Sequence, residues 1–371
     1  MTRGDRVLVI AGLAACAFAL AALAILVAQR GIGRNFASYD LSAYIDAARR
    51  LRDGLPLYPQ LAGGGYELGE VNLYLYPPPV AALFLPALLL PFAVASALWG
   101  ALLTAIAGGV AIALARTVPP ARRPLAAALV IGALPLQWEL ANGNITLVTL
   151  ALALAAWAWL PRRRTAVPLA LAMGLKLLAA PVALAVAVAG AWRVLRWTAV
   201  VLAAVLVATW PFLAAAWLDW VRLGAQLAAG PQTRSYNVVP ELLRAGPGRA
   251  LLLAGAPAAI AALGWLVRRR RLTPAAGFGA ALAAAPYCSA FVFYPYATLA
   301  LPVLVRLALG VPSRAATVAG WTAWLLIEVQ ALDPDTRVPS ALLGTLIAVG
   351  ATIAVATRER APSARLTGSS P

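Results

Sequence analysis

Asp40 is the carboxylate whose place in the sequence most favours chemistry. It opens a stretch that ends at Gly54, in which apolar residues recur at helical spacing: Leu41, Tyr44, Ile45, Ala48 and Leu51. Such a stripe predicts an amphipathic helix that lies in the plane of a membrane surface. Two interpretations of Asp40 stay open. Its carboxylate can cap the start of the helix, or it can take a proton from an incoming hydroxyl as a general base.

Lys176 is the single lysine among thirty basic residues, and it stands between two short apolar segments. An ionisable side chain inside an apolar run is costly and marks a functional candidate. Its ammonium can bind a phosphate, or it can extend toward polar headgroups. Arg234 and Arg244, with Asn237 between them, are further candidates because guanidinium groups bind phosphate through paired hydrogen bonds. The alternative is that these three are solvated loop residues.

Tyrosine and asparagine side chains make up the other candidates. Rings such as those before the three prolines at 77–79 can anchor a chain at a membrane interface, or they can stack on a sugar or a lipid. Asparagines beside a glycine also serve simply to form a turn. The candidate sugar or lipid contacts are Tyr44, Tyr74, Tyr76, Asn142, Asn144, Asn237 and Tyr294. Because the chain has no His, and both its Cys lie in apolar runs, we expect no metal site and no cofactor.

The composition predicts which elements position these residues. Of 371 residues, 63% are hydrophobic and 12% charged, whereas a soluble domain is about 45–50% apolar. We therefore expect an all-α polytopic membrane protein with about twelve transmembrane helices. They are predicted near residues 7–28, 92–115, 125–140, 143–160, 166–176, 177–190, 197–217, 250–267, 275–288, 290–308, 315–332 and 339–356. Residues 79–90 are expected to form an interfacial or re-entrant helix.

Charge predicts the orientation of the spans. The net charge of +17 fits arginine-rich cytoplasmic loops, such as 162–164 and 268–271, better than it fits a nucleic-acid partner. With both termini cytoplasmic, only Asp5 and Glu359 of the acidic residues lie inside.

Two long outer segments, 29–91 and 218–249, then share one side of the membrane and are expected to form the active-site face. We expect residues 1–360 to form one integral membrane domain, with 7–28 as a retained signal anchor. Residues 361–371 are expected to be a disordered cytoplasmic tail.

Four stretches, taken in order, resemble glycosyltransferase family 87, which comprises proteins similar to the polyprenyl-phosphate-mannose-dependent α-1,2-mannosyltransferases of the GT-C superfamily. They are Asp40 with the Gly54-Leu-Pro-Leu-Tyr58 turn, Tyr76-Pro-Pro-Pro with Leu85-Pro86, Asn142-Gly-Asn-Ile-Thr, and Gly174-Leu-Lys176 with Pro181. The late Pro-Tyr stretch around Tyr294 departs from the family, whose members often carry a His or an acidic residue there.

The resemblance implies a GT-C-type fold and a hexosyltransferase of the cell (plasma) membrane. The implied donor is a sugar, expected to be mannose, on polyprenyl phosphate, and the acceptor is a hydroxyl of a lipid or glycan. Asp40 maps onto the family's essential aspartate, which implies inverting transfer without a metal. Lys176, Arg234 and Arg244 would bind the donor phosphate.

Two other functions stay open at this point. One is a transporter or lipid flippase, which would place ionisable groups near the middle of its spans, where most spans of this sequence have none. The other is a non-catalytic partner in an envelope-assembly complex.

Overall fold

The computed structural model describes residues 10, 17, 38–61, 74–160, 162–229, 239, 243, 246–289, 292–332 and 339–358. Most of them lie in helices, and the described part contains no β-sheet, so the predicted all-α class is confirmed. The α-helices are α2 (Tyr39–Arg52), α3 (Pro78–Leu83), α4 (Phe92–Ala115), α5 (Arg123–Gly132), α6 (Leu134–Asn142), α7 (Thr146–Ala158), α8 (Ala166–Leu175), α9 (Val182–Val188), α10 (Trp192–Ala229), α11 (Gly246–Arg268), α12 (Pro274–Ala284), α13 (Leu301–Val305), α14 (Arg314–Leu332) and α15 (Ser340–Arg358). The predicted first span, apart from residues 10 and 17, and the predicted tail lie outside the described residues.

Three described helices are long and apolar enough to cross a membrane: α4, α10 and α11. A fourth span results if α5 and α6, which meet at a bend of 50°, count as one. The predicted number of twelve is not confirmed. Several other predicted spans are shorter apolar helices; α7, for example, has 13 residues and is about 20 Å long at a rise of 1.5 Å per residue.

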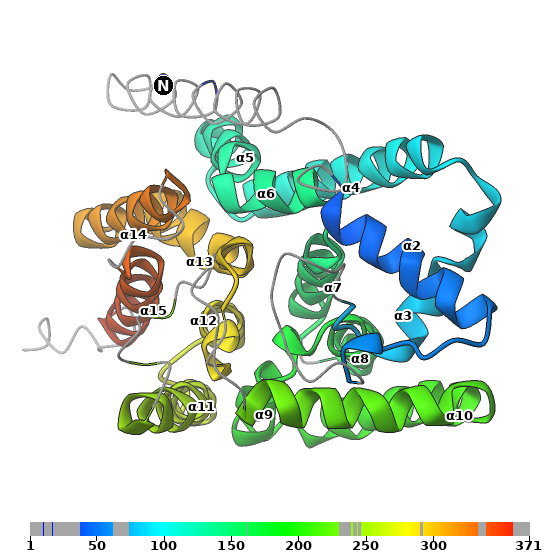
Figure 1. Ribbon diagram of the computed structural model, residues 1–371. Coiled ribbons are helices and arrows are strands. Elements are labelled where there is room, and N and C mark those ends of the chain that lie inside the picture. The colour runs from blue at the N-terminus through cyan, green and yellow to red at the C-terminus, as the bar shows by residue number, and fades with distance from the viewer. Residues whose placement is uncertain are drawn as a thin grey trace, which may run out of the picture.

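Helix α10 is longer than predicted. It runs for 38 residues along one side of the molecule (Figure 1), and its apolar side chains Val207 and Phe212 are 71% and 84% exposed. A helix with so much outward apolar surface belongs in lipid. The outer segment expected at 218–249 is helical at both ends, because α10 continues to Ala229 and α11 begins at Gly246.

Helix α2 lies between α4 and α10 and packs against α3 and α6 (Figure 1). Its predicted apolar stripe is confirmed: Leu41, Tyr44, Ile45 and Ala48 are buried. They belong to a cluster that we call the loop core, which comprises Leu41, Tyr44, Ile45, Ala47, Ala48, Leu57, Tyr58, Tyr74, Tyr76, Val80, Ala81, Phe84, Ala95, Ile145 and Leu223. This second core fixes α2 and α3 on the helix bundle.

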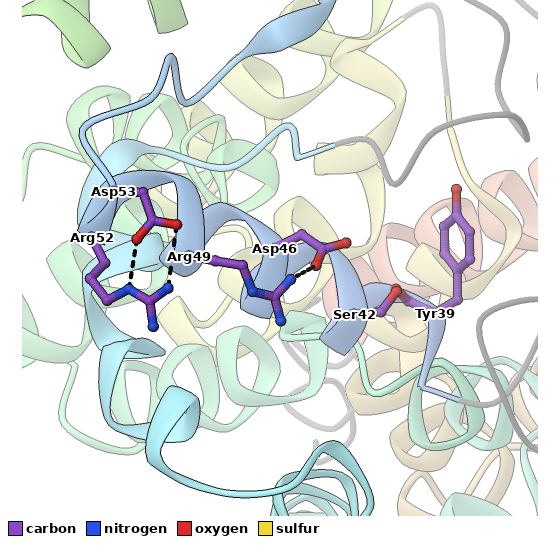
Figure 2. A network of polar contacts seen from close by, with 6 residues as sticks. All are labelled: Tyr39, Ser42, Asp46, Arg49, Arg52 and Asp53. Atoms are coloured by element: carbon purple, nitrogen blue, oxygen red, sulfur yellow. Dashed lines mark hydrogen bonds and ion pairs between the residues drawn. The ribbon is translucent and has the colours of Figure 1, made fainter.

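The opposite side of α2 is polar, as Figure 2 shows. Arg49 pairs with Asp46 at 2.6 Å, as the i,i+3 spacing of a helix favours, and Arg52 pairs with its neighbour Asp53 at 2.8 Å at the end of the helix. Asp40 does not cap this helix, so the capping interpretation is wrong. The cap position is Ser38, with a left-handed φ of 63° and no capping side-chain bond. Asp40 stands inside the first turn, with its carboxylate free to contact another element.

Candidate active site

A tight turn after α6 brings Asn144 to the start of α2. The turn depends on Gly143, whose φ of 68° is left-handed. A Cβ atom at Gly143 would also lie only 3.2 Å from the Cβ of Leu41. The Gly143 carbonyl accepts a hydrogen bond from the indole of Trp99 at 2.7 Å, which holds the turn against α4.

The side chain of Asn144 joins two charged groups. Its Nδ2 donates to Oδ2 of Asp40 at 2.8 Å, and its Oδ1 accepts from Nζ of Lys176 at 3.1 Å. The backbone N–H of Thr146 also donates to Oδ1, at 2.9 Å. Two donors face one side of the amide and a carboxylate, which can only accept, faces the other. The hydrogen-bond network therefore assigns Oδ1 to the side of Lys176 and Nδ2 to the side of Asp40. A carboxylate and an ammonium from distant parts of the sequence thus share one amide.

Lys176 reaches the site because the helical conformation is interrupted between α8 and the short helix η5 (Leu177–Ala179). At this interruption the backbone of Lys176 is extended, with φ −153°. Its Nζ also donates to Oγ1 of Thr146 at 2.7 Å, and it lies 4.2 Å from the ring centre of Tyr296. The residue is 7% exposed. Its ammonium is therefore stabilised by hydrogen bonds and by an aromatic face.

Asp40 is the more accessible member of the pair, because it is half-buried. Burial among protein atoms raises the pKa of Asp40 above its ordinary 3.8, while the charge of Lys176 and the hydrogen bond from Asn144 oppose the rise. A carboxylate with a raised pKa is a stronger base, and part of the Asp40 residue remains exposed.

Tyr44 and Tyr76 form one wall next to this pair. The Tyr44 hydroxyl accepts from the backbone N–H of Ile145 at 3.1 Å, and the two rings meet edge to face at 4.9 Å. The Tyr76 hydroxyl lies 3.4 Å from Nζ of Lys176. Both predicted residues therefore lie beside the polar network.

The other predicted candidates lie elsewhere. Tyr74 is buried in the loop core, and its hydroxyl donates to the Pro77 carbonyl at 2.8 Å. Asn142 is the buried last residue of α6. Tyr294 is buried, and the charge that acts on its hydroxyl comes from Glu328 on α14. Arg234, Asn237 and Arg244 lie outside the described residues.

Three residues of the network were not among the predicted candidates: Glu139, Thr146 and Tyr296. Glu139 is fully buried, and its charge interacts with those of Lys176 and Asp40. An ionisable side chain within an apolar run is the signal that singled out Lys176, and it applies equally to Glu139. Thr146 and Tyr296 carry no comparable signal, because they act only through their contacts.

The acidic residues do not gather into a metal site within the described ranges, where no three His, Cys, Asp or Glu side chains come together. The polar network consists of a carboxylate, an amide, a hydroxyl and an ammonium. These groups can accept a proton and stabilise negative charge.

The model of glycosyltransferase family 87 matches residues 74–295 of the chain, which include Tyr76, Asn144 and Lys176. Neither a curated protein nor a solved structure gives a significant match. The matched range covers more than half of the 371 residues. With its apolar helices and its match over most of the bundle, the chain belongs to glycosyltransferase family 87 and is a membrane glycosyltransferase.

Proposed function

We propose that this glycosyltransferase moves a hexose, mannose in the simplest case, from polyprenyl phosphate to a hydroxyl of a lipid or glycan, with inversion at the anomeric carbon. The observation that carries the proposal is the bridge from Asp40 through Asn144 to Lys176. It holds the carboxylate of a half-buried residue beside a buried positive charge. Membership of a glycosyltransferase family favours transfer chemistry over the transporter, the flippase and the non-catalytic partner.

Asp40 acts as the general base in this scheme. Its carboxylate takes the proton of the acceptor hydroxyl as that oxygen attacks the anomeric carbon from the face opposite the phosphate. The bond from the anomeric carbon to the phosphate oxygen breaks, and its electron pair leaves with the polyprenyl phosphate. Phosphate is a good leaving group and needs no general acid, so positive charge near it is sufficient.

Lys176 supplies part of that charge. Its hydrogens point to Asn144, Thr146 and Tyr76, so its ammonium acts on the phosphate through its field, and any direct contact would need the side chain to turn. Arg234 and Arg244 of the second outer segment are proposed as direct phosphate ligands because of their forked donors. Asn237 is proposed to contact the sugar or the lipid. Tyr44 and Tyr76 are buried in the loop core, so we propose that they position the polar network.

The donor is a membrane lipid, so we propose that the site opens at the outer surface of the plasma membrane, with both termini cytoplasmic. The arginine-rich loops support this orientation. Single cysteines in place of Arg49 and Arg268, in a chain without Cys16 and Cys288, test it with an impermeant thiol reagent on intact cells. Arg49→Cys should be labelled and Arg268→Cys should not; labelling at 268 would reverse the orientation.

The deciding experiment measures transfer of radiolabelled sugar from short-chain polyprenyl-phosphate-mannose into membrane lipid or glycan. It compares wild type with Asp40→Asn and, as a matched control on the same helix, Asp46→Asn. Loss of a general base lowers kcat by about 10²- to 10⁴-fold, whereas Asp46 pairs with Arg49 on the polar side of α2 and its variant should keep activity. Equal transfer by Asp40→Asn and wild type would remove Asp40 as the base. Absence of transfer in all three proteins would reject this donor.

A further inference from the structure

The break between α5 and α6 leaves backbone groups without helical partners inside the apolar bundle. α5 ends at Gly132 and α6 begins at Leu134, and Pro135 has no N–H to offer. Unpaired backbone groups in a membrane are costly, so a broken helix needs partners from its neighbours. The side chain of Gln137 donates to the carbonyl of Ile131 across the bend.

The N–H of Leu134 is bonded by a carboxylate from a distant helix. Oε2 of Glu328, on α14, accepts from it at 2.9 Å across 194 positions of sequence. Glu328 is 9% exposed, and within the described residues its Oε1 has no hydrogen-bond partner. The carboxylate also faces the positive end of the α6 dipole. An acidic side chain in an apolar span costs free energy, so Glu328 is a candidate for a functional role.

Two elements that reach the active site converge on this carboxylate. One is α6, which carries Glu139 and ends in the turn that presents Asn144; the carbonyl of Ala141 accepts from the N–H of Ser38 at 2.7 Å. The other is the short helix η8 (Tyr294–Ala300), which packs against α6 and α14. The charge of Glu328 acts on the buried hydroxyl of Tyr294, the first residue of η8. The ring of Tyr296, on the same helix, lies next to Nζ of Lys176.

We propose that Glu328 is a positioning residue for glycosyl transfer: by holding the start of α6 it sets where Asn144 meets Asp40 and Lys176. The kinetic test of this inference, which measures sugar transfer, rests on the proposed function. Glu328 itself does not touch the reacting groups. Its effect passes through α6, which spans the distance between Leu134 and the turn at Gly143 as one rigid helix.

The test compares kcat and KM for short-chain polyprenyl-phosphate-mannose among variants. Glu328→Leu removes the acceptor, Glu328→Asp keeps the charge but shortens the side chain, and Glu328→Gln keeps an acceptor oxygen. We expect the first two to lower kcat by about a hundredfold, as small misplacement of reacting groups does, with KM little changed. Glu328→Gln should restore most of kcat. Wild-type kcat in both Glu328→Leu and Glu328→Asp would overturn the proposal.

Gln330→Leu is the matched control. Gln330 lies on the same helix, is 1% exposed, and accepts from Oγ of Ser340 at 3.1 Å and from the N–H of Ala341 at 3.3 Å. It therefore joins α14 to α15 by the same kind of buried link, away from α6. We expect a lower Tm with kcat preserved. A loss of kcat equal to that of Glu328→Leu would mean that Glu328 acts through general stability, and would overturn the proposal.

A crosslinking measurement keeps this test separate from the identity of the donor. Cysteines replace Ser38 and Ala141 in a chain without Cys16 and Cys288, and the rate of disulfide formation reports how α6 meets the start of α2. The rate should fall with Glu328→Leu and stay unchanged with Glu328→Gln and Gln330→Leu. An unchanged rate with Glu328→Leu overturns the positioning role even if the wild type transfers no sugar, whereas absent transfer with the expected crosslinking pattern rejects only the donor.

Discussion

Asp40 and Lys176 lie on opposite sides of a single amide, that of Asn144, which donates to one at 2.8 Å and accepts from the other at 3.1 Å. The amide is 3% exposed, so water does not replace it readily. Because both bonds involve a charged group, each is stronger than a neutral hydrogen bond. A change in the charge or position of Asp40 therefore affects Lys176, and the reverse, through their electrostatic interaction and through the orientation of the Asn144 amide.

Removal of the bridge should lower activity without unfolding the protein. Asn144→Leu leaves the carboxylate of Asp40 without its donor, and we expect kcat/KM to fall roughly 10- to 100-fold, since a hydrogen bond to a charged group contributes about 1.5–3 kcal/mol. Thr149→Val is the control, because the hydroxyl of Thr149 on α7 is buried and donates to the Ile145 carbonyl of its own turn. Steady-state kinetics in detergent measure both variants. Equal kcat/KM in the two would contradict a role for the bridge.

The pH profile should report the charge of Lys176. Activity needs ionised Asp40, so kcat/KM rises with pH through the pKa of Asp40 in the folded enzyme. The charge of Lys176 lowers that pKa. Lys176→Met should therefore move the acid limb of the profile to higher pH, and Lys176→Arg should return it toward the wild-type position. A limb that moves to lower pH in Lys176→Met would exclude Asp40 as the titrating base.

Asp40→Asn should make the protein more stable while making it inactive. Burial raises the pKa of Asp40 in the folded state above the ordinary 3.8, so between these values the folded protein binds more protons than the unfolded chain. Stability contributed by this group therefore falls as pH rises through that window, and the cost is fully present above the folded pKa. We expect a higher Tm for Asp40→Asn at neutral pH, and no gain below about pH 3.8.

Asp53→Asn provides a control of opposite sign for that measurement. The hydrogen bond from Arg52 lowers the pKa of Asp53, so its ionised form contributes stability above the ordinary carboxyl pKa that is lost as pH falls. The pair is exposed, and the effect is small. An increase in Tm for Asp53→Asn as large as that for Asp40→Asn would point to a general effect of removing negative charge.

Local signals in the sequence predicted the elements better than they predicted the site. The apolar run at 92–115 is helical over those residues, and the stripe from Leu41 to Ala48 is buried as its spacing indicates. Both follow from the period of a helix. The capping interpretation of Asp40 failed because the helix begins at Tyr39 with Ser38 at the cap, and the Asp40 carboxylate instead accepts from Asn144, 104 positions away. Such contacts depend on how helices pack, which no local pattern encodes.

Packing also decides what Glu139 and Glu328 do, although an ionisable side chain in an apolar run is a signal that the sequence itself carries for both. Each stands alone in an apolar helix, and its relation to Lys176 or to Leu134 exists only after α6 has bent away from α5. The bend itself comes from Ala133, which is extended, followed by Leu134 and Pro135. Pro135 marks a helix start in the sequence, but the carboxylate that completes that start comes from another helix.

A pair of glycine variants tests whether the turn after α6 matters beyond its backbone strain. Gly143 and Gly54 have nearly the same left-handed φ, 68° and 67°, so alanine at either position incurs a similar strain of about 1–2 kcal/mol. A Cβ at Gly54 meets no atom within 4 Å, whereas at Gly143 it meets Leu41 at 3.2 Å and Trp99 at 3.3 Å. The comparison therefore isolates the contact of the turn with α2 and α4.

Gly143→Ala should lower Tm more than Gly54→Ala, because overpacking adds about 1–3 kcal/mol to the strain that both share. It should also lower kcat, since Leu41 stands next to Asp40 and any shift of the turn moves Asn144 away from the carboxylate. Gly54→Ala should keep the kcat of the wild type. Thermal unfolding in detergent and sugar transfer are measured on the same preparations. If the two variants lose equal stability and both keep kcat, the contact between this turn and α2 does not set the geometry of the site.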